Sequence, residues 1–283
     1  MVTGILAMMI SQPTGVFPLA VERVRPEGER QVYWVRGPKD GGELKGVGSM
    51  VTQIPGGGFL FVPSGELARL KGFDGDGKEI LNLAKPGFSA VGRPSVDWGG
   101  NFAVVEFVGD GESEIWRIPL RGKGPEVQIA TVRGNPGLVN PAVEMRGTGL
   151  WLNFGGSWSI QDMATAATQR VDTRPLTDGL PAGTRVVEVR PSPVIPKQVA
   201  VGIELANDTK SRWVMVWDRQ SNRVSRVSPI GSDGFQVDWS RDGRTVLFHS
   251  REVESGRVTL RGVAPTGGET VEIAVVEEAK GAG

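Results

Sequence analysis

A unit of 45 to 48 residues recurs five times along this chain, and this repeat restricts the fold more than any other feature. Each copy has a short apolar strand, a turn rich in Gly or Pro, and a second apolar strand. One valine of the first strand marks the same position in every copy, at Val51, Val96, Val143, Val189 and Val237. A fixed period of 20 to 50 residues indicates a repeat architecture in which each unit packs on its neighbours.

The rest of each unit also has the pattern of β-strands. A third segment rich in aromatic and β-branched residues follows the polar loop, as at 114–118 and 213–217. A Gly-rich turn then leads to a fourth short segment, such as 127–130, and no stretch sustains a helical period of 3.6 residues. Four antiparallel strands in 45 to 48 residues are typical of a propeller blade. The sequence therefore predicts an all-β protein, a single β-propeller of about six four-stranded blades.

We expect one domain, residues 1–283, although five or seven blades also fit the irregular first unit. The expected blade units are 1–47, 48–92, 93–139, 140–185, 186–233 and 234–283. The first unit lacks an innermost strand, and residues 274–278 follow directly after the last outer strand. We predict that this segment completes the first unit. Pairing of the two termini would then close the ring and remove the free sheet edge.

Residues 235–270 resemble the TolB-type, WD-like repeat. The run VDWSRDGRTVLFHS, followed by a strand and Gly-Gly-Glu, matches that family's Trp-Ser-Pro-Asp-Gly turn, with Arg241 in place of the proline. Trp239 is expected to fill the space between neighbouring sheets, and Asp242-Gly243 to form the turn of a hairpin. Trp98 stands at the same position of an earlier copy and is predicted to be core as well.

The resemblance covers most of the chain in spacing and one blade in motif. It implies a propeller that docks protein partners and that lies in the periplasm or another extracytoplasmic compartment. Without it we would expect a cytoplasmic protein, because no signal peptide is evident in this chain. The apolar run at 4–10 is too short to span a bilayer, so we interpret it as a buried strand and expect no direct membrane insertion.

The composition excludes several classes of function. The chain has no cysteine, which excludes disulfides, zinc–thiolate sites and thiol nucleophiles. His249 is the one histidine, and no Gly-x-Ser-x-Gly motif occurs, so we interpret His249 as a hydrogen-bonded residue at a strand end rather than a member of a catalytic triad. The 32 basic and 32 acidic residues balance, which gives no electrostatic reason to expect a nucleic-acid partner. We predict no metal and no cofactor.

The innermost strands supply the candidate site. Alternate residues of such a strand face the axial channel. If the repeat valines pack between blades, the next residue of each copy faces inward, giving Thr52, Asp97, Glu144, Arg190 and Asp238. These side chains predict a polar, mildly acidic channel suited to a cation or a cationic ligand, unless they cap turns or pair with Arg190.

Trp158 is a separate candidate. It lies among small residues near an expected loop, where a tryptophan could anchor a protein interface. The alternative interpretation is that it packs on its own blade.

Three functions remain open. The first is a non-catalytic protein-interaction scaffold, alone or as a subunit of a larger assembly, which binds through loops at the channel mouth. The second is a propeller hydrolase or lyase that acts on a small ligand in the channel, with or without a metal. The third is an accessory propeller of a larger peptidase. Because no catalytic constellation assembles in the sequence, we favour the scaffold and do not expect an enzyme.

Overall fold

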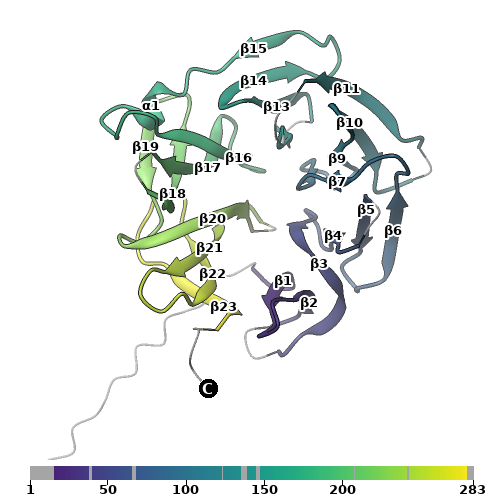
Figure 1. Cartoon of the computed structure of the whole chain (residues 1–283), viewed down its shortest axis with the longest axis horizontal. Helices are drawn as coiled ribbons and strands as arrows, with labels where there is room; N and C mark the ends of the chain where they lie inside the picture. Colours follow the sequence, from purple (N-terminus) through teal and green to yellow (C-terminus); the bar gives the residue numbers. More distant parts are fainter. Residues whose placement is uncertain are drawn as a thin grey trace, which may run out of the picture.

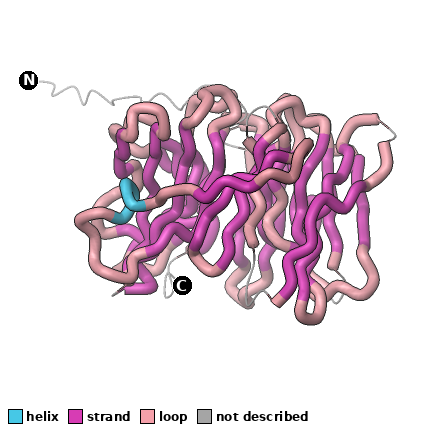
Figure 2. The backbone as a smooth tube through the Cα atoms, turned by 90° about the horizontal axis from the view of Figure 1, so that it is seen from above, coloured by secondary structure: helices cyan, strands magenta, loops and turns pink. Residues whose placement is uncertain are grey.

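The computed structural model describes residues 16–37, 40–65, 68–122, 124–134, 139–144, 147–206, 208–240 and 242–278, and the apolar run at 4–10 lies outside these ranges. The strands form antiparallel sheets arranged around a ring (Figure 1). Seen from the side, the strands run between two faces that carry the loops (Figure 2). One short helix, α1 (Arg174–Thr177), joins two blades. The all-β propeller predicted from the repeat is confirmed.

Five blades have four strands each, counted from the ring axis outward. The first three blades contain β3 (Glu43–Gln53), β4 (Phe59–Pro63), β5 (Arg69–Phe73) and β6 (Glu79–Ala84); β7 (Ala90–Val91) with β8 (Ser95–Val96), β9 (Phe102–Val108), β10 (Glu112–Pro119) and β11 (Val127–Arg133); and β12 (Ala142–Val143), β13 (Gly149–Phe154), β14 (Ser157–Asp162) and β15 (Thr168–Arg170). The last two contain β16 (Arg185–Pro191), β17 (Gln198–Leu205), β18 (Asp208–Asp218) and β19 (Arg223–Arg226); and β20 (Ser232–Trp239), β21 (Val246–Glu252), β22 (Val258–Val263) and β23 (Val271–Glu277). In the second blade the innermost position is taken by two short strands, β7 and β8, which both pair with β9.

A smaller N-terminal unit lies between the first and the last of these blades. It consists of β1 (Leu19–Val24), β2 (Arg30–Val35) and the first half of β3. The long strand β3 changes partner between Val47 and Gly48, where its pairing passes from β2 to β4. The first two units are therefore one continuous sheet of six strands. Six four-stranded blades are not found: the described residues form five, together with this three-stranded unit.

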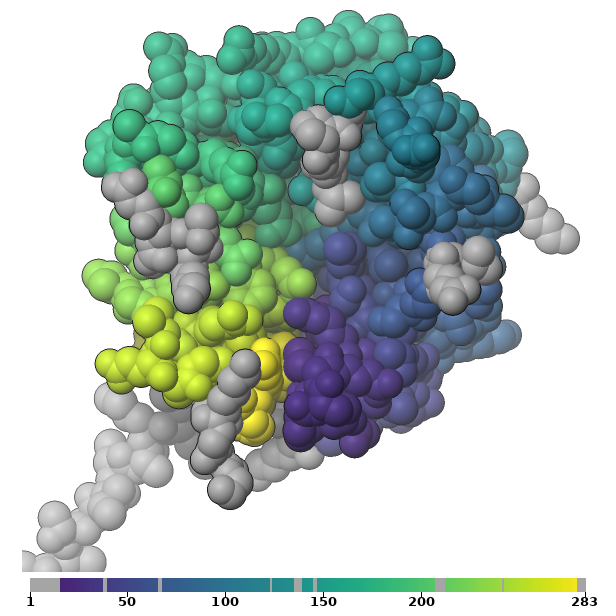
Figure 3. All heavy atoms as spheres, in the orientation of Figure 1, coloured from purple at the N-terminus to yellow at the C-terminus, as the bar shows by residue number. Residues whose placement is uncertain are grey.

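The termini meet in a different way from the predicted one. Residues 274–278 do not form a separate strand, because β23 runs through Val271–Glu277 and pairs with β22 along its whole length, from Gly262↔Val271 to Val258↔Glu277. Among the described strands, β23 has no hydrogen-bonded partner in the N-terminal unit. Figure 3 shows the first and last strands of the chain side by side at the surface. The ring is closed by contact between side chains rather than by strand pairing.

Apolar side chains fill every junction between neighbouring units of the ring. Each of six buried clusters combines residues of two consecutive units. The cluster that closes the ring packs Leu19 and Val21 of β1 against Leu260, Ile273 and Val276 of the last blade. Because each sheet buries both of its faces in this way, burial of apolar surface holds the blades together.

The five repeat valines all lie on innermost strands, namely β3, β8, β12, β16 and β20. In three of these strands a β-bulge interrupts the pairing beside the valine: between Ser49 and Thr52, between Val186 and Glu188, and between Phe235 and Asp238. Bulges redirect side chains and occur often beside functional sites. The blade repeat thus carries a local irregularity at the ring axis.

The motif of the last blade forms a tight turn, as its resemblance implies. Trp239 is buried, and its indole N–H donates a hydrogen bond of 2.9 Å to the carbonyl oxygen of Arg190 in the neighbouring blade. Asp242 accepts a hydrogen bond from the Ser240 hydroxyl at 2.6 Å. Gly243 has a φ of +67°, and a Cβ atom there would lie 2.7 Å from Val194 Cγ2. Only glycine fits this turn without strain.

Trp98 departs from the prediction that it belongs to the core. It is 39% exposed and borders an open cavity with Pro55 and Arg121. The turn that follows it has the sequence Gly-Gly-Asn rather than Asp-Gly, and Asp97 organises that turn. The same position of the repeat is therefore core in one blade and surface in another.

No helix in the described part of the chain has the length and apolar character needed to cross a membrane.

Candidate binding site in the axial channel

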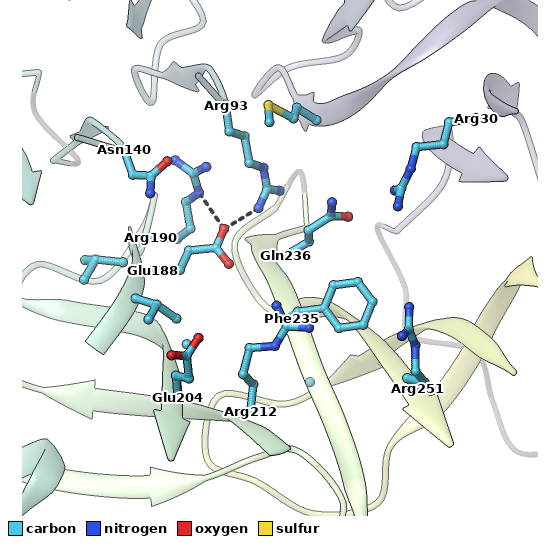
Figure 4. A pocket seen from close by; sticks show the side chains of 15 residues that line it. Arg30, Arg93, Asn140, Glu188, Arg190, Glu204, Arg212, Phe235, Gln236 and Arg251 are labelled. Carbon is cyan, nitrogen blue, oxygen red and sulfur yellow. Dashed lines mark hydrogen bonds and ion pairs between the residues drawn. The ribbon is translucent and has the colours of Figure 1, made fainter. Parts of the chain in front are cut away.

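A cavity of about 430 Å³ opens at one end of the ring axis, and we call it the axial cavity. Its wall is built from all five blades and the N-terminal unit (Figure 4). Five arginines and two glutamates supply its charged groups: Arg30, Arg93, Arg190, Arg212, Arg251, Glu188 and Glu204. Since every unit contributes to the wall, the cavity depends on the closed ring.

Arg93 ties four blades together across the axis. It lies between β7 and β8, and its guanidinium donates to Glu188 Oε1 at 2.5 Å and to Asp238 Oδ2 at 3.1 Å. The same group donates to the backbone carbonyls of Val237, at 2.8 Å, and Val51, at 3.2 Å. Desolvation favours a lower pKa for Arg93, but the charges of Glu188 and Asp238 outweigh it and raise the pKa above its usual value. Arg93 is a buried, fully charged cross-link.

Arg190 lies beside Arg93 but lacks comparable partners. It is 5% exposed, and its Nε lies 3.6 Å from Glu188 Oε1, beyond hydrogen-bond distance. No other described residue accepts a hydrogen bond from this Nε. Desolvation, followed by the positive charge of Arg93, lowers the pKa of Arg190 to about 10. Figure 4 shows its guanidinium between Asn140 and Arg93, facing the cavity.

Phe235 is an aromatic platform at the cavity wall. The guanidinium of Arg212 lies 4.7 Å from its ring centroid and that of Arg251 lies 5.7 Å from it. Arg212 also forms a bidentate ion pair with Asp233, at 3.0 and 2.9 Å. Arg251 stands on β21 and forms no ion pair with a described residue. The outer part of the axial cavity therefore combines an apolar ring with positive charge.

The backbone around the cavity is strained. Met50, Asn140 and Gln236 line it, and all three have a positive φ, at 58°, 49° and 52°. Non-glycine residues rarely adopt this conformation, and where they do they cluster at functional sites. Met50 and Gln236 occupy the bulges of β3 and β20. The strain thus lies where the inner strands expose side chains to the axis.

Three of the five residues predicted to line the channel share one small cavity, and the other two lie elsewhere. Thr52, Arg190 and Asp238 border a small cavity of about 50 Å³, and the Thr52 hydroxyl donates to the carbonyl of Pro94 at 2.9 Å. Asp97 caps the turn after β8 by accepting from the backbone N–H of Asn101, at 2.6 Å, and Phe102, at 2.8 Å. The axial cavity itself contains one of the five, Arg190.

Glu144 faces away from the axial cavity. It accepts hydrogen bonds from the Trp151 indole and from Arg219, both at 3.1 Å, and borders a cavity of about 270 Å³ between two blades. The described residues contain no group of three or more histidine, aspartate or glutamate side chains with the spacing of a metal site. The charged groups of the axial cavity are mostly arginines, and Arg190 is the predicted channel residue among them.

Trp158 does not reach the surface. It is 1% exposed, packs edge-on against Trp151, and donates its indole N–H to the carbonyl of Val186 at 3.0 Å. It therefore joins two blades and cannot anchor a partner. The small residues around it mark the turn 155–156, which precedes the strand that carries the tryptophan.

His249 lies within β21 rather than at its end, is buried, and packs edge-on against Phe235 at 5.5 Å between ring centroids. Desolvation lowers its pKa to about 3, with further contributions from the charges of Arg93 and Arg30. The imidazole is therefore neutral at physiological pH.

Sequence reasoning missed most of the residues that line the axial cavity. Glu188 stands two positions before the predicted Arg190 with no bulge between them, so the alternation that selected Arg190 also indicates Glu188. Gln236 lies in the bulge of β20, where the alternation is interrupted. Arg93 stands outside the repeat, and its one signal is a charged residue directly before Pro94 at the start of a blade.

Comparison with known proteins identifies solved structures with a similar fold. No protein-family model matches the sequence, and no curated protein matches it. TolB from Acinetobacter baumannii is similar with a TM-score of 0.62 at 15% identity, covering 92% of this chain and 66% of that one. A TolB structure from Agrobacterium tumefaciens has a TM-score of 0.53 at 12% identity, with 93% and 82% covered.

A puromycin hydrolase structure has a TM-score of 0.52 at 12% identity, and the match covers 90% of this chain and 45% of that one. The chain thus spans just under two thirds of the first TolB structure and less than half of the hydrolase. Similarity at such low identity concerns the fold. Together with the ring of blades and the Trp-Ser-x-Asp-Gly turn of the last one, it shows that the chain is a TolB-like β-propeller.

Proposed function

We propose that the protein is a non-catalytic interaction module that binds a protein partner at the end of the ring where the axial cavity opens. The observation that carries this proposal is a pair of apolar side chains on that rim. Ile230 is 92% exposed in the loop between β19 and β20, and Val253 is 67% exposed in the hairpin between β21 and β22.

These two loops belong to the same face as the axial cavity. Ser232 pairs with Glu252, so the strand that follows Ile230 and the strand that precedes Val253 are neighbours. Asp233, Gly234 and Arg251 continue from this pair toward the cavity wall. Exposed apolar side chains next to a charged concave surface offer a partner both the apolar and the polar contacts that protein interfaces use.

Quantitative affinity purification from the native cells tests the proposal. The double substitution Ile230→Glu with Val253→Glu is expected to lose the stoichiometric partner that the wild-type protein retains. Val127→Glu is the matched control, because Val127 is also exposed but lies on the outer strand β11 of another blade. A partner that the double variant retains, or that Val127→Glu also loses, would place the docking surface elsewhere.

A second candidate is an accessory propeller of a larger peptidase. The match to puromycin hydrolase favours it, because this chain corresponds to 45% of that protein. An immunoblot of the native source distinguishes the two. A band near 30.3 kDa, the mass of this chain, supports the separate module, whereas a band of twice that mass supports the peptidase.

A further inference from the structure

We infer that the axial cavity binds a carboxylate-bearing ligand, with the guanidinium of Arg190 as the group that holds the carboxylate. This inference goes beyond partner docking at the rim, because it concerns the interior of the cavity. It also reverses the charge of the ligand expected from sequence, where the channel residues suggested a cationic one.

Arg190 has a buried N–H donor, Nε, without a hydrogen-bond acceptor in the described part of the chain. A guanidinium carries five N–H donors, and a buried donor without an acceptor costs about 1–3 kcal/mol. Arg190 is more than nine-tenths buried, and its Nε has no acceptor among the described residues. The neighbouring Glu188 does not satisfy it, because Glu188 Oε1 lies 3.6 Å from the Nε, beyond hydrogen-bond distance, and already accepts from Arg93. An oxyanion placed in the cavity would supply an acceptor.

The shape and composition of the cavity wall also favour a carboxylate-bearing ligand. Val187, Val189 and Phe235 give the cavity an apolar side, so a ligand with a hydrocarbon part fits better than a bare ion. A carboxylate is planar and can accept two parallel hydrogen bonds from a guanidinium fork. Glu188 and Glu204 lie on the same wall, and their negative charge disfavours a phosphate dianion relative to a singly charged carboxylate.

Neighbouring residues hold Arg190 in position. Its backbone carbonyl accepts the Trp239 indole hydrogen bond, which fixes the strand at this residue. Arg93 beside it forms ion pairs with Glu188 and Asp238, whereas the carboxylate oxygen nearest to Arg190, Glu188 Oε1, lies 3.6 Å from its Nε. Met50 and Gln236, which also line the cavity, have a positive φ and lie in bulges of the inner strands. A buried guanidinium held in place in this way is preorganised to bind an anion.

Isothermal titration calorimetry with defined probes tests the inference. Hexanoate is expected to bind the wild-type protein at least roughly tenfold more tightly than hexanamide, which has the same chain and no charge. Inorganic phosphate is expected to bind more weakly than hexanoate. Equal binding of hexanoate and hexanamide, or tighter binding of phosphate, would overturn the inference.

The substitution Arg190→Met removes the charge and keeps much of the side-chain volume. We expect the variant to lose the preference for hexanoate while its melting temperature stays at or above that of the wild type, because an unsatisfied buried cation is removed. Arg133→Met, at an exposed position on β11, is the matched control and should keep the preference. If Arg190→Met does not fold, Arg190→Lys retains the charge without the fork and should weaken hexanoate binding. Full preference in either folded variant would overturn the inference.

The carboxylate could belong to a small organic acid or to an acidic side chain of a polypeptide. The blocked peptides Ac-Ala-Glu-Ala-NH2 and Ac-Ala-Gln-Ala-NH2 distinguish these sources. A preference for the glutamate peptide that exceeds the preference for hexanoate assigns the carboxylate to a polypeptide, and the reverse assigns it to a small acid. Either result supports the carboxylate site when hexanoate also binds more tightly than hexanamide, and the absence of that preference contradicts the site. Because neither assay uses Ile230 or Val253, the inference can fail without affecting the proposed docking surface.

Discussion

The two ends of the ring axis use charged residues in opposite ways. At the end where the innermost strands finish, Asp97 and Asp242 are occupied by turns: each accepts hydrogen bonds from groups within five residues of itself. At the end where the axial cavity opens, Arg93 and Glu188 pair across blades, and Arg190 is left without an equivalent partner.

The charged residues of the turn end therefore serve the fold, whereas those of the cavity end include Arg190, the proposed binding group. In two blades the turn end uses the same device, because Asp97 and Asp242 each accept hydrogen bonds from backbone N–H groups of a tight turn. The cavity end does not repeat, because its groups meet only after the ring has closed. Asp97 and Asp242 at the turn end are satisfied locally, whereas Arg190 at the cavity end retains an N–H donor without an acceptor among the described residues.

The largest expected effect comes from Arg93→Met. This substitution removes the buried cation that pairs with Glu188 and Asp238, whose side chains are 18% and 20% exposed, and breaking such a largely buried ion pair costs about 3–5 kcal/mol. We therefore expect urea unfolding at pH 7 to show a loss of this size. Arg190→Met, at the next position in space, should cost nothing. A loss below about 1 kcal/mol for Arg93→Met would show that the two arginines contribute equally to stability.

The second effect is a pH dependence at the cavity end. The pKa of His249 is lowered to about 3 in the folded protein, below the unfolded value of about 6.5, so the unfolded chain binds more protons between these values. The contribution of His249 to stability is complete above pH 6.5 and is lost as the pH falls toward 3, by about 1.4 kcal/mol per pH unit.

Denaturant unfolding at pH 6.5 and pH 4.5 measures this contribution, with His249→Gln as the reference that cancels the titration of all other groups. The wild type should lose about 2–3 kcal/mol more than the variant over this interval. Equal losses in both proteins would mean that the imidazole is protonated in the folded state.

The third effect belongs to the turn end. Asp97→Ala removes the acceptor of the backbone N–H groups of Gly99, Asn101 and Phe102 and should cost about 2 kcal/mol in urea unfolding. Glu204→Ala at the cavity end removes an exposed ion pair with Arg185 and should cost less than about 1 kcal/mol. The reverse order would mean that the cavity end, and not the turn end, determines the stability of the blades.

The smallest effect is expected at the rim. The paired substitutions Ile230→Glu and Val253→Glu should change the free energy of unfolding by less than about 0.5 kcal/mol, because both side chains are exposed in the folded protein. Thermal melting checks this, and a larger loss would mean that these residues stabilise the blade rather than face a partner.

Sequence reasoning reached the fold because blades are local. Each unit carries its own strands and turns within 48 residues, so the spacing of five valines and the motif from Val237 to Gly243 sufficed to predict the propeller. The count of strands in the N-terminal unit was less accessible, since β3 serves two units and the pattern of residues does not show where its partner changes.

The candidate site was less predictable for a physical reason. Alternation relates Glu188 to Arg190, but it is interrupted at Gln236 by the bulge of β20. Which side chains face the cavity therefore depends on bulges and on Arg93, which contacts residues 95 and 144 positions away. Such long-range contacts leave no local pattern. The exposure of Trp98 and the burial of Trp158 are further cases in which the neighbouring blade, and not the local sequence, decides the environment.

The junction between β1 and β23 also has a consequence for the order of assembly. Leu19 and Val21 find their apolar partners in Ile273 and Val276, about 250 residues further along the chain. During synthesis the early blades can pack on one another as soon as they emerge, but the face of β1 stays uncovered until β23 has been made. Shielding of that face, by a chaperone or by rapid completion of the chain, is thus part of what this ring needs in order to form in a cell.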